Sequence, residues 1–252
     1  MKRETIEIQK EMFSEDSSSM QKYCDLVVGK RGFGALLKYE LITSHSCVPG
    51  ALGLFLRSKL FPCLFRDCGR GVTFGQNVVL RHPHKISIGD NVVIDDNCVL
   101  DAKGKDNDGI RIGSGVFVGR NSILSCKNGD ITLGDNVNIG FNCEVFSASQ
   151  VVLGKSSLVA AYCYFIGGGH DYDDPTTSVL DQGRNSIGIQ AGEGSWFGAG
   201  AKILDGVKIG AHAIVGANSV VTRDVPDYAV AAGTPAEVKR DRRDAGAPPS
   251  DE

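Results

Sequence analysis

The sequence predicts a mainly β protein built as a three-sided solenoid, preceded by a helical segment. Large aliphatic or aromatic residues recur every six positions along most of the chain, and a small residue usually follows each of them. Glycine supplies 32 of the 252 residues, roughly twice its average usage. A period of six fits neither a helix nor a single strand. Three such units make an 18-residue coil of short strands that end at tight corners.

Residues 1–70 precede the repeat and are expected to form an N-terminal helical segment. KRGFGALLKYELI and PGALGLFLRSKLF predict two short helices, the second with proline at its start. Residues 21–70 hold eight basic and three acidic side chains, a balance of +5 in a chain whose net charge is −3. Two interpretations fit: a cap on the open end of the solenoid, or contact with an anionic membrane surface, with Arg57 and Lys59 snorkelling out of the apolar stretch.

The repeat itself spans residues 71–238. The aliphatic residue of each unit, and the residue four positions later, should point into the prism. Cys98, Cys143 and Cys163 occupy the second of these positions, so we expect buried free thiols rather than metal ligands. No C-x-x-C motif and no apolar leader occur, which favours a reducing, cytoplasmic location.

Every irregular insertion leaves the repeat at an equivalent point. Extra residues follow the third unit of a coil, so all the insertions should leave one edge of the prism. They come after Leu80, Leu100, Leu124, Val145 and Phe165. The longest insertion separates Phe165 from Ala191 and contains the run GGGHDYDDP. Long loops on rigid scaffolds commonly carry function, so the function should lie here.

Four stretches carry a family resemblance. They are Gly169-His170-Asp171-Tyr172, Ser195-Trp196-Phe197-Gly198-Ala199, Val220-Val221-Thr222-Arg223-Asp224-Val225-Pro226 and Ala231-Ala232-Gly233-Thr234-Pro235-Ala236. With the repeat, this pattern resembles the hexapeptide-repeat acyltransferases, within them the galactoside and maltose O-acetyltransferases and related polysaccharide O-acetyltransferases. The resemblance implies a left-handed parallel β-helix over residues 71–238. It also implies a homotrimer with active sites between subunits, acetyl-CoA as co-substrate and no metal.

His170 matches the general base of that family. An alcohol is a poor nucleophile toward a thioester, and imidazole titrates near neutral pH, so a histidine can take the hydroxyl proton and return it. The resemblance implies that Asn142 and Asp171 contact a sugar or glycan acceptor. It places the cofactor along a further set of residues: Trp196, Gly198, Ala199, Ala217, Thr222, Arg223 and Arg240. We therefore expect an acetyl-CoA-dependent O-acetyltransferase.

Two departures from the family pattern affect the site. Gly140 stands where the sugar acetyltransferases have an asparagine that helps place the acceptor, which leaves Asn142 to do part of that work. Glu237 stands where relatives have a second arginine, so Arg240 is the remaining match near the nucleotide phosphate. The acceptor and the phosphate contact therefore differ from the family pattern.

Other functions remain alternatives at this point. An N-acetyltransferase acting on an amino-sugar, or a non-catalytic solenoid scaffold, would share this repeat. A zinc carbonic anhydrase needs three histidine ligands, and the close pair His82 and His84 is far from His170 along the chain. Near-neutral charge without a basic and aromatic stripe disfavours a nucleic-acid binder. The membrane alternative would place the protein at the inner face of the membrane. Residues 239–252 are expected to form a disordered tail.

Overall fold

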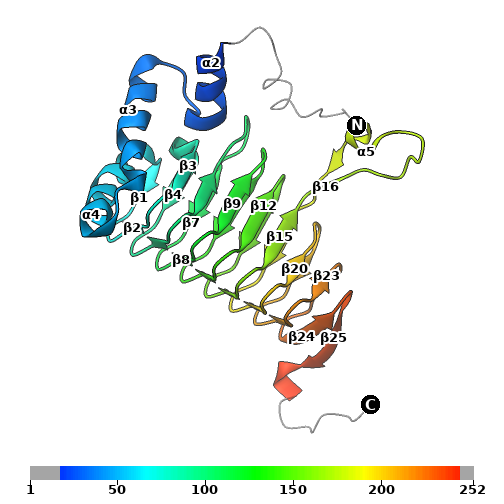
Figure 1. Cartoon of the computed structure of the whole chain (residues 1–252). Helices are drawn as coiled ribbons and strands as arrows, with labels where there is room; N and C mark the ends of the chain where they lie inside the picture. The colour runs from blue at the N-terminus through cyan, green and yellow to red at the C-terminus, as the bar shows by residue number, and fades with distance from the viewer. Residues whose placement is uncertain (1–17, 245–252) are drawn as a thin grey trace.

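The computed structural model describes residues 18–244, and these form a β-solenoid of three parallel sheets with helices at its N-terminal end (Figure 1). Each coil contributes one strand to sheet A, one to sheet B and one to sheet C, in that order. The predicted fold class, a mainly β solenoid with a helical N-terminal segment, is confirmed.

The strands are two to six residues long, as six-residue units require. Sheet A contains β1 (Asp67–Cys68), β4 (Ile86–Ile88), β7 (Ile110–Ile112), β10 (Asp130–Leu133), β13 (Gln150–Leu153), β18 (Ile189–Ala191) and β21 (Lys208–Ile209). Sheet B contains β2 (Thr73–Phe74), β5 (Val93–Ile94), β8 (Phe117–Val118), β11 (Asn138–Ile139), β14 (Leu158–Val159), β19 (Trp196–Phe197), β22 (Ile214–Val215), β24 (Ala229–Gly233) and β25 (Ala236–Asp241). Sheet C contains β3 (Val79–Arg81), β6 (Val99–Asp101), β9 (Ile123–Cys126), β12 (Glu144–Ser147), β15 (Tyr164–Gly167), β20 (Lys202–Ile203) and β23 (Val220–Val221).

The interior of the prism is the stack predicted from the repeat. Equivalent apolar residues align in register from coil to coil, for example Ile139 with Val159 and Val145 with Phe165. Cys98, Cys143 and Cys163 are buried free thiols, as expected. Such stacking places apolar side chains on apolar side chains along the whole axis, which is the main stabilising contribution of this core.

Asparagine makes most of the turns between sheet B and sheet C, here called the B–C corner. Asn97, Asn121 and Asn142 all adopt φ between 55 and 60°, a left-handed conformation that asparagine tolerates better than most residues. Asn97 also donates its side-chain amide to the Asn121 carbonyl oxygen at 3.2 Å. The corners are thus fixed by backbone conformation and by hydrogen bonds between coils.

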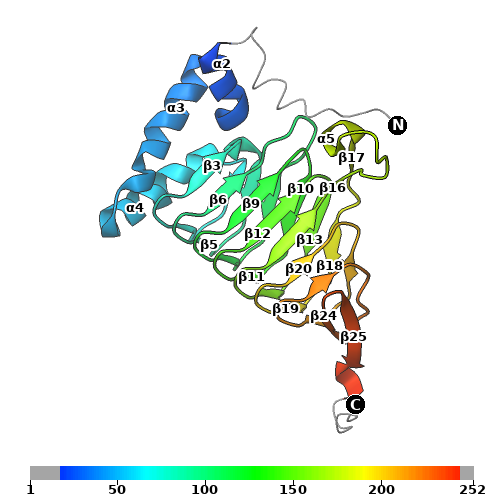
Figure 2. The same cartoon turned by 45° about the vertical axis from the view of Figure 1, so that its right-hand side comes forward.

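The insertions leave the edge between sheet C and the next strand of sheet A, here called the C–A edge. The longest one runs from β15 to β18 and contains β16 (Gly169–His170), α5 (Val179–Gln182) and β17 (Arg184–Asn185). Figures 1 and 2 show it projecting beyond the strands. The prediction that irregular loops share one edge is confirmed.

Helices cover the first coil. These are α2 (Ser19–Tyr23), the π-helical turn Cys24–Val28, α3 (Phe33–Thr43), α4 (Gly50–Leu60) and 3₁₀ turns at Ser44–Cys47 and Phe61–Leu64. Phe61 and Phe65 pack on Phe74 of β2, with ring centroids 5.4 and 5.5 Å apart. The Tyr39 hydroxyl donates to the Leu80 carbonyl at 2.6 Å. The cap interpretation of this segment is therefore confirmed (Figure 2).

Arg57 behaves differently from the prediction. Instead of snorkelling outward it is 2% exposed, and its Nε donates to the Phe74 carbonyl at 2.9 Å. Its Nη1 donates to the Val48 carbonyl at 2.7 Å. The guanidinium satisfies main-chain carbonyls where α4 meets the first coil, because a planar fork of donors can serve several acceptors at once. Lys59, by contrast, is exposed as expected.

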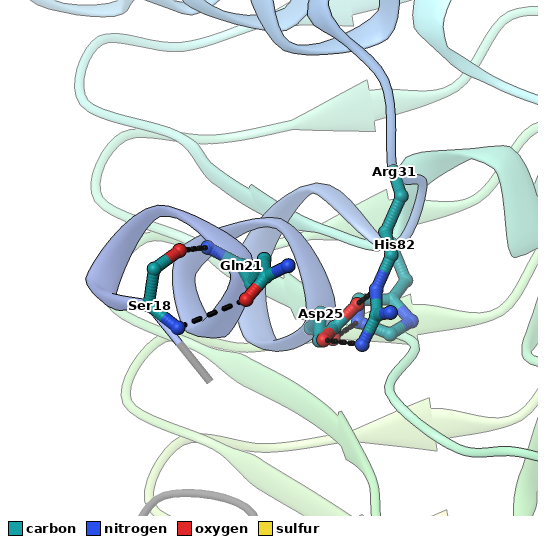
Figure 3. Close-up of polar contacts among 5 residues, drawn as sticks. All are labelled: Ser18, Gln21, Asp25, Arg31 and His82. Atoms are coloured by element: carbon teal, nitrogen blue, oxygen red, sulfur yellow. Dashed lines mark hydrogen bonds and ion pairs between the residues drawn. The ribbon is translucent and has the colours of Figure 1, made fainter. Parts of the chain in front are cut away.

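Figure 3 shows how the first helix is attached to the solenoid. Ser18 and Gln21 form a capping box at the start of α2, with hydrogen bonds of 2.9 and 3.3 Å. Arg31 binds both carboxylate oxygens of Asp25, at 2.8 and 2.7 Å. The carbonyl oxygen of Asp25 accepts a 2.8 Å hydrogen bond from His82 Nε2. The π-helical turn is therefore fastened to the edge of the second coil.

The C-terminal end is ordered further than expected. β25 pairs antiparallel with β24 through Asp241, and a 3₁₀ turn covers Arg242–Asp244. The Arg242 side chain donates to the His212 carbonyl at 2.6 Å. The expected tail at 239–252 is thus wrong for residues 239–244, and residues 245–252, like residues 1–17 of the expected helical segment, lie outside the described range. Within 18–244, no helix combines the length and apolarity needed to cross a bilayer.

Candidate active site

His170 lies on a short hairpin that leaves the solenoid after β15. It is paired with Arg184 in the antiparallel β16–β17 ribbon. His170 Nδ1 and Arg184 Nε are both buried and lack a hydrogen-bond partner within the described chain. Unpaired buried polar atoms are unfavourable, so two of them on one cross-strand pair make this hairpin a candidate site.

The glycines before His170 have a local explanation. A Cβ on Gly167 would come within 2.8 Å of the Phe146 carbonyl oxygen, and one on Gly168 within 2.8 Å of Ala148 Cβ. Gly169 has room, since the nearest atom to its Cβ would be 3.9 Å away. The chain therefore needs glycine at Gly167 and Gly168 to pass over the previous coil, and only Gly169 borders open space.

Asp174 holds the loop in shape. It accepts hydrogen bonds from the hydroxyls of Thr176 and Thr177 at 2.7 and 2.6 Å, and these lower its pKa to about 2. Gln182 bonds both main-chain groups of Asp174, at 2.9 and 2.8 Å. Asp171 is half-buried beside His170, and its N–H donates to the Gly183 carbonyl at 3.2 Å. Asp174 is thus occupied with loop structure, while the Asp171 carboxylate lies beside Gly183, where a Cβ would come within 3.3 Å of Oδ2.

Two of the expected cofactor residues share the outer face of sheet B. Trp196 is 46% exposed, next to Leu158 on one side and Ile214 on the other. Ile214 pairs with Val230, which pairs with Arg240. Three strand spacings separate Trp196 from Arg240, about 14 Å. An exposed indole and an exposed guanidinium on one face suit a ligand that carries both an apolar arm and phosphates.

The B–C corner holds a second group of expected residues. Ala199 and Ala217 are exposed there, on neighbouring coils, and Gly198 is buried against Ala217. Asn142 lies at the same corner two coils earlier, at φ 55°. Its position is explained by the turn, whether or not its amide also contacts an acceptor.

The remaining expected residues lie on the opposite edge of sheet C. Thr222 and Arg223 follow β23 and are exposed at the C–A edge, two coils beyond the hairpin of His170. Sheet C separates this edge from Asn142 and Ala217. One chain therefore brings His170, Asp171, Thr222 and Arg223 to one edge, and Trp196, Gly198, Ala199, Ala217, Arg240 and Asn142 to the other corner and its adjoining sheet.

Sequence reasoning missed two residues. Arg184 is a basic residue near the end of a loop that holds four aspartates before it. This contrast in charge could have pointed to Arg184 from the sequence. Tyr162 adopts φ 63° at the B–C corner, where other coils have asparagine or glycine, and its ring meets that of Phe141 edge to face at 5.9 Å. A bulky aromatic in the left-handed region is uncommon and indicates a selected position.

The side chains that commonly bind metals are spread out. Among residues 18–244, no group of three or more His, Cys, Asp or Glu side chains is arranged to hold a metal ion. The rings of His82 and His84 stack at 5.9 Å and belong to the attachment of the cap.

Family profiles and curated relatives match the repeat region. The profile described as "Bacterial transferase hexapeptide (six repeats)" matches residues 192–223, and "Hexapeptide repeat of succinyl-transferase" matches residues 130–164. A Mycobacterium tuberculosis protein described as a probable acetyltransferase is 31% identical over 134 residues, 53% of this chain and 45% of that protein. A candidate acetyltransferase of Staphylococcus aureus is 33% identical over 127 residues, 43% of this chain and 64% of that protein. The chain thus spans about half the length of the curated relatives it matches.

Solved structures share the solenoid. The polysialic acid O-acetyltransferase OatWY superposes with a TM-score of 0.55 at 19% identity, covering 70% of this chain and 82% of that one. The N-acyltransferase AntD from Bacillus cereus, in complex with dTDP-4-amino-4,6-dideoxyglucose and coenzyme A, gives 0.52 at 20% identity, covering 71% and 84%. At such identities the likeness concerns the fold alone.

Proposed function

Because the chain belongs to the hexapeptide-repeat acetyltransferase family, we propose that it transfers an acetyl group from acetyl-CoA to a hydroxyl of a sugar or glycan precursor. The observation that carries the proposal is the hairpin pair of His170 and Arg184. A histidine stands on a hairpin outside the core, paired with an arginine, and its ring Nδ1 has no hydrogen-bond partner in the described chain. This is the placement that a general base for a bound acceptor needs.

In the proposed reaction His170 accepts the proton of the acceptor hydroxyl while the oxygen attacks the thioester carbonyl. The C–O bond forms and the C–S bond breaks as the tetrahedral intermediate collapses. Coenzyme A leaves as a thiolate and takes up the proton held by the imidazolium. Proton and acyl group are thus balanced without a covalent enzyme intermediate, and a buried cysteine nucleophile is not required.

The distribution of residues supports a site shared between subunits. In one chain the hairpin of His170 and the corner of Ala199 and Ala217 lie on opposite sides of sheet C. Placing the C–A edge of one copy beside the B–C corner of the next would unite them. A head-to-tail contact of this kind closes into a ring, and we propose a homotrimer with acetyl-CoA between subunits, lying along Trp196 and Arg240.

Transfer is tested with acetyl-CoA and a panel of sugars and oligosaccharides, by measuring release of free coenzyme A thiol together with the mass of the acceptor. The expected product gains one acetyl group and loses it in alkaline hydroxylamine, since that reagent cleaves oxygen esters and leaves amides intact. An acetylated amino-sugar that resists hydroxylamine would identify the N-acetyltransferase instead. Binding of coenzyme A without transfer to any acceptor, and without hydrolysis, would favour the non-catalytic scaffold.

A further inference from the structure

The outer side of the N-terminal helices carries exposed apolar residues at helical spacing. Along α3, Phe33, Leu37 and Leu41 are 79%, 45% and 59% exposed. Residues four apart lie on one face of a helix, so these three form a single stripe. Its opposite face is the one that packs, through buried Tyr39 and partly buried Leu36 and Ile42.

The next helix along the chain also exposes apolar residues. On α4, Leu52, Leu54 and Phe55 are 64%, 43% and 58% exposed, while Gly53 and Arg57 face the first coil and are buried. On α2, Met20 is 58% exposed. Scattered exposed apolar side chains are ordinary, but seven of them on three helices of one segment, three of them in a single stripe, indicate an interaction surface.

Basic side chains surround this apolar surface. Residues 18–70 contain eight Lys and Arg against three Asp and Glu, +5, while the whole chain is −3. Lys30, Lys38 and Lys59 are exposed, and the Lys59 ammonium lies 5.9 Å from the Phe55 ring centre. Aromatic and aliphatic residues mixed with lysine are typical of helices that lie in the interface of an anionic bilayer.

We propose that the outer face of α2, α3 and α4 docks on an anionic phospholipid surface. The apolar side chains named above enter the headgroup boundary, and the lysines pair with lipid phosphates. The buried half of the segment, through Arg57, Tyr39 and Phe61, keeps the face rigid on the solenoid. A second copy of this chain is the poorer occupant, because the exposed lysines of the two faces, Lys30, Lys38 and Lys59, would repel each other.

The binding test uses the full chain with sedimented vesicles of phosphatidylcholine, with and without one third phosphatidylglycerol. The protein is expected to pellet with the anionic vesicles at low salt and to be released at 0.5 M salt, which shortens the screening length to a few ångström, about 4 Å. Phe33→Ser/Leu37→Ser/Leu41→Ser should lower the partition coefficient about tenfold or more. Lys30→Gln should lower it about fivefold, the factor expected for one basic residue.

Val238→Ser serves as the matched control, since Val238 is 51% exposed on β25 at the other end of the solenoid. This variant should bind vesicles like the unaltered chain, and all variants should keep its melting temperature because the altered side chains are exposed. Equal pelleting of the triple-serine variant, or no pelleting by any form, overturns the proposal. Light scattering could instead give the unaltered protein a mass larger than three chains, and the triple-serine variant a smaller one. That result would assign the face to a protein contact.

Discussion

His170 and Arg184 are paired across the β16–β17 hairpin, and each has a buried nitrogen without a partner, Nδ1 on the imidazole and Nε on the guanidinium. No carboxylate in the described chain lies within ion-pair distance of Arg184, although four aspartates precede it in the loop. The pair is therefore the part of the proposed site to test first.

Replacing His170 tests its role as a base. His170→Ala should lower kcat by about 10²- to 10⁴-fold, the usual contribution of a general base, and leave the Kd for coenzyme A within about twofold. The loop lies outside the stacked core, so the melting temperature should not change. His45→Ala, in the 3₁₀ turn Ser44–Cys47, is the control histidine variant. A His170→Ala enzyme that kept more than a tenth of the rate would exclude His170 as the base.

Arg184 should act on the acceptor. A hydrogen bond to a charged donor contributes about 1.5–3 kcal/mol, so Arg184→Gln should raise the acceptor KM roughly 10- to 100-fold while the Kd for coenzyme A stays constant. Arg184→Lys should recover part of the loss. Arg111→Gln, which alters an exposed arginine on sheet A, is expected to behave like the unaltered enzyme. A fall in kcat alone, with KM unchanged, would instead indicate a purely structural role in the hairpin.

The oligomer should have three subunits. Light scattering coupled to size exclusion is expected to give three times the 26.8 kDa chain mass at micromolar concentration. A stable mass of one chain under the same conditions would contradict the shared site.

Mixing two inactive variants tests the shared site directly. His170→Ala disables the C–A edge, and Ala217→Trp should block the B–C corner, where Ala217 is exposed. Refolded or co-expressed as an equal mixture, the two should recover about a quarter of the unaltered activity, because one interface in four then joins two intact halves. Each variant alone should remain inactive. Absence of any recovery in a mixed trimer would place the whole site within one chain.

Acid should loosen the attachment of the cap. Burial is the main cause of the lowered pKa of His82. Burial also lowers the pKa of His84 to about 4, and the nearby cations lower that pKa further. Both pKa values lie below the ordinary value, so the neutral rings favour the folded state. That stability is fully present above about pH 6.5 and is lost as pH falls toward 4. Facing charges are Lys30, Arg66, Lys85, Lys103 and Asp101.

Thermal melts between pH 7.5 and 4.5 check this expectation. The melting temperature should fall as the pH is lowered through this window. The free energy of unfolding should change by less than about 1.4 kcal/mol per pH unit, the slope for a fully buried group, because His84 is only half-buried. His84→Gln cannot take up the proton and should flatten the profile, whereas His45→Gln should leave it unchanged. Identical slopes for all three proteins would remove the two rings from the explanation.

Replacing Tyr162 should stabilise the protein. The Tyr162 backbone at φ 63° costs a non-glycine residue about 1 kcal/mol or more, and asparagine occupies the equivalent position at Asn142 and Asn218. Tyr162→Asn is therefore expected to raise the melting temperature by about 2–4 °C. Asn121→Tyr, the reverse change two coils away, should lower it by a similar amount. Loss of activity together with the gain in stability would give the tyrosine a role at the site; an unchanged or lower melting temperature would contradict the strain argument.

The period of six was sufficient to predict the coils, the inward residues and the single edge that carries the loops. It could not predict the fate of Arg57, because a basic residue within an apolar stretch can either reach water or bind main-chain carbonyls, and only the packing of α4 on β2 decides. The order of residues 239–244 was missed for a similar reason, since β25 depends on pairing with β24. Arg184 could not be identified because its relation to His170 arises from the hairpin register, 14 residues away along the chain.

The covered ends of the solenoid have a consequence for how the protein behaves in bulk. Strands β1, β2 and β3 each have a backbone edge with no preceding coil, and α4 lies against β2 there. At the far end β25 runs antiparallel to β24 and ends the parallel order of sheet B. Parallel edges left open on both ends would match each other in spacing and direction, so copies could add head to tail without limit and form fibrils. Covering sheet B at both ends therefore opposes such growth.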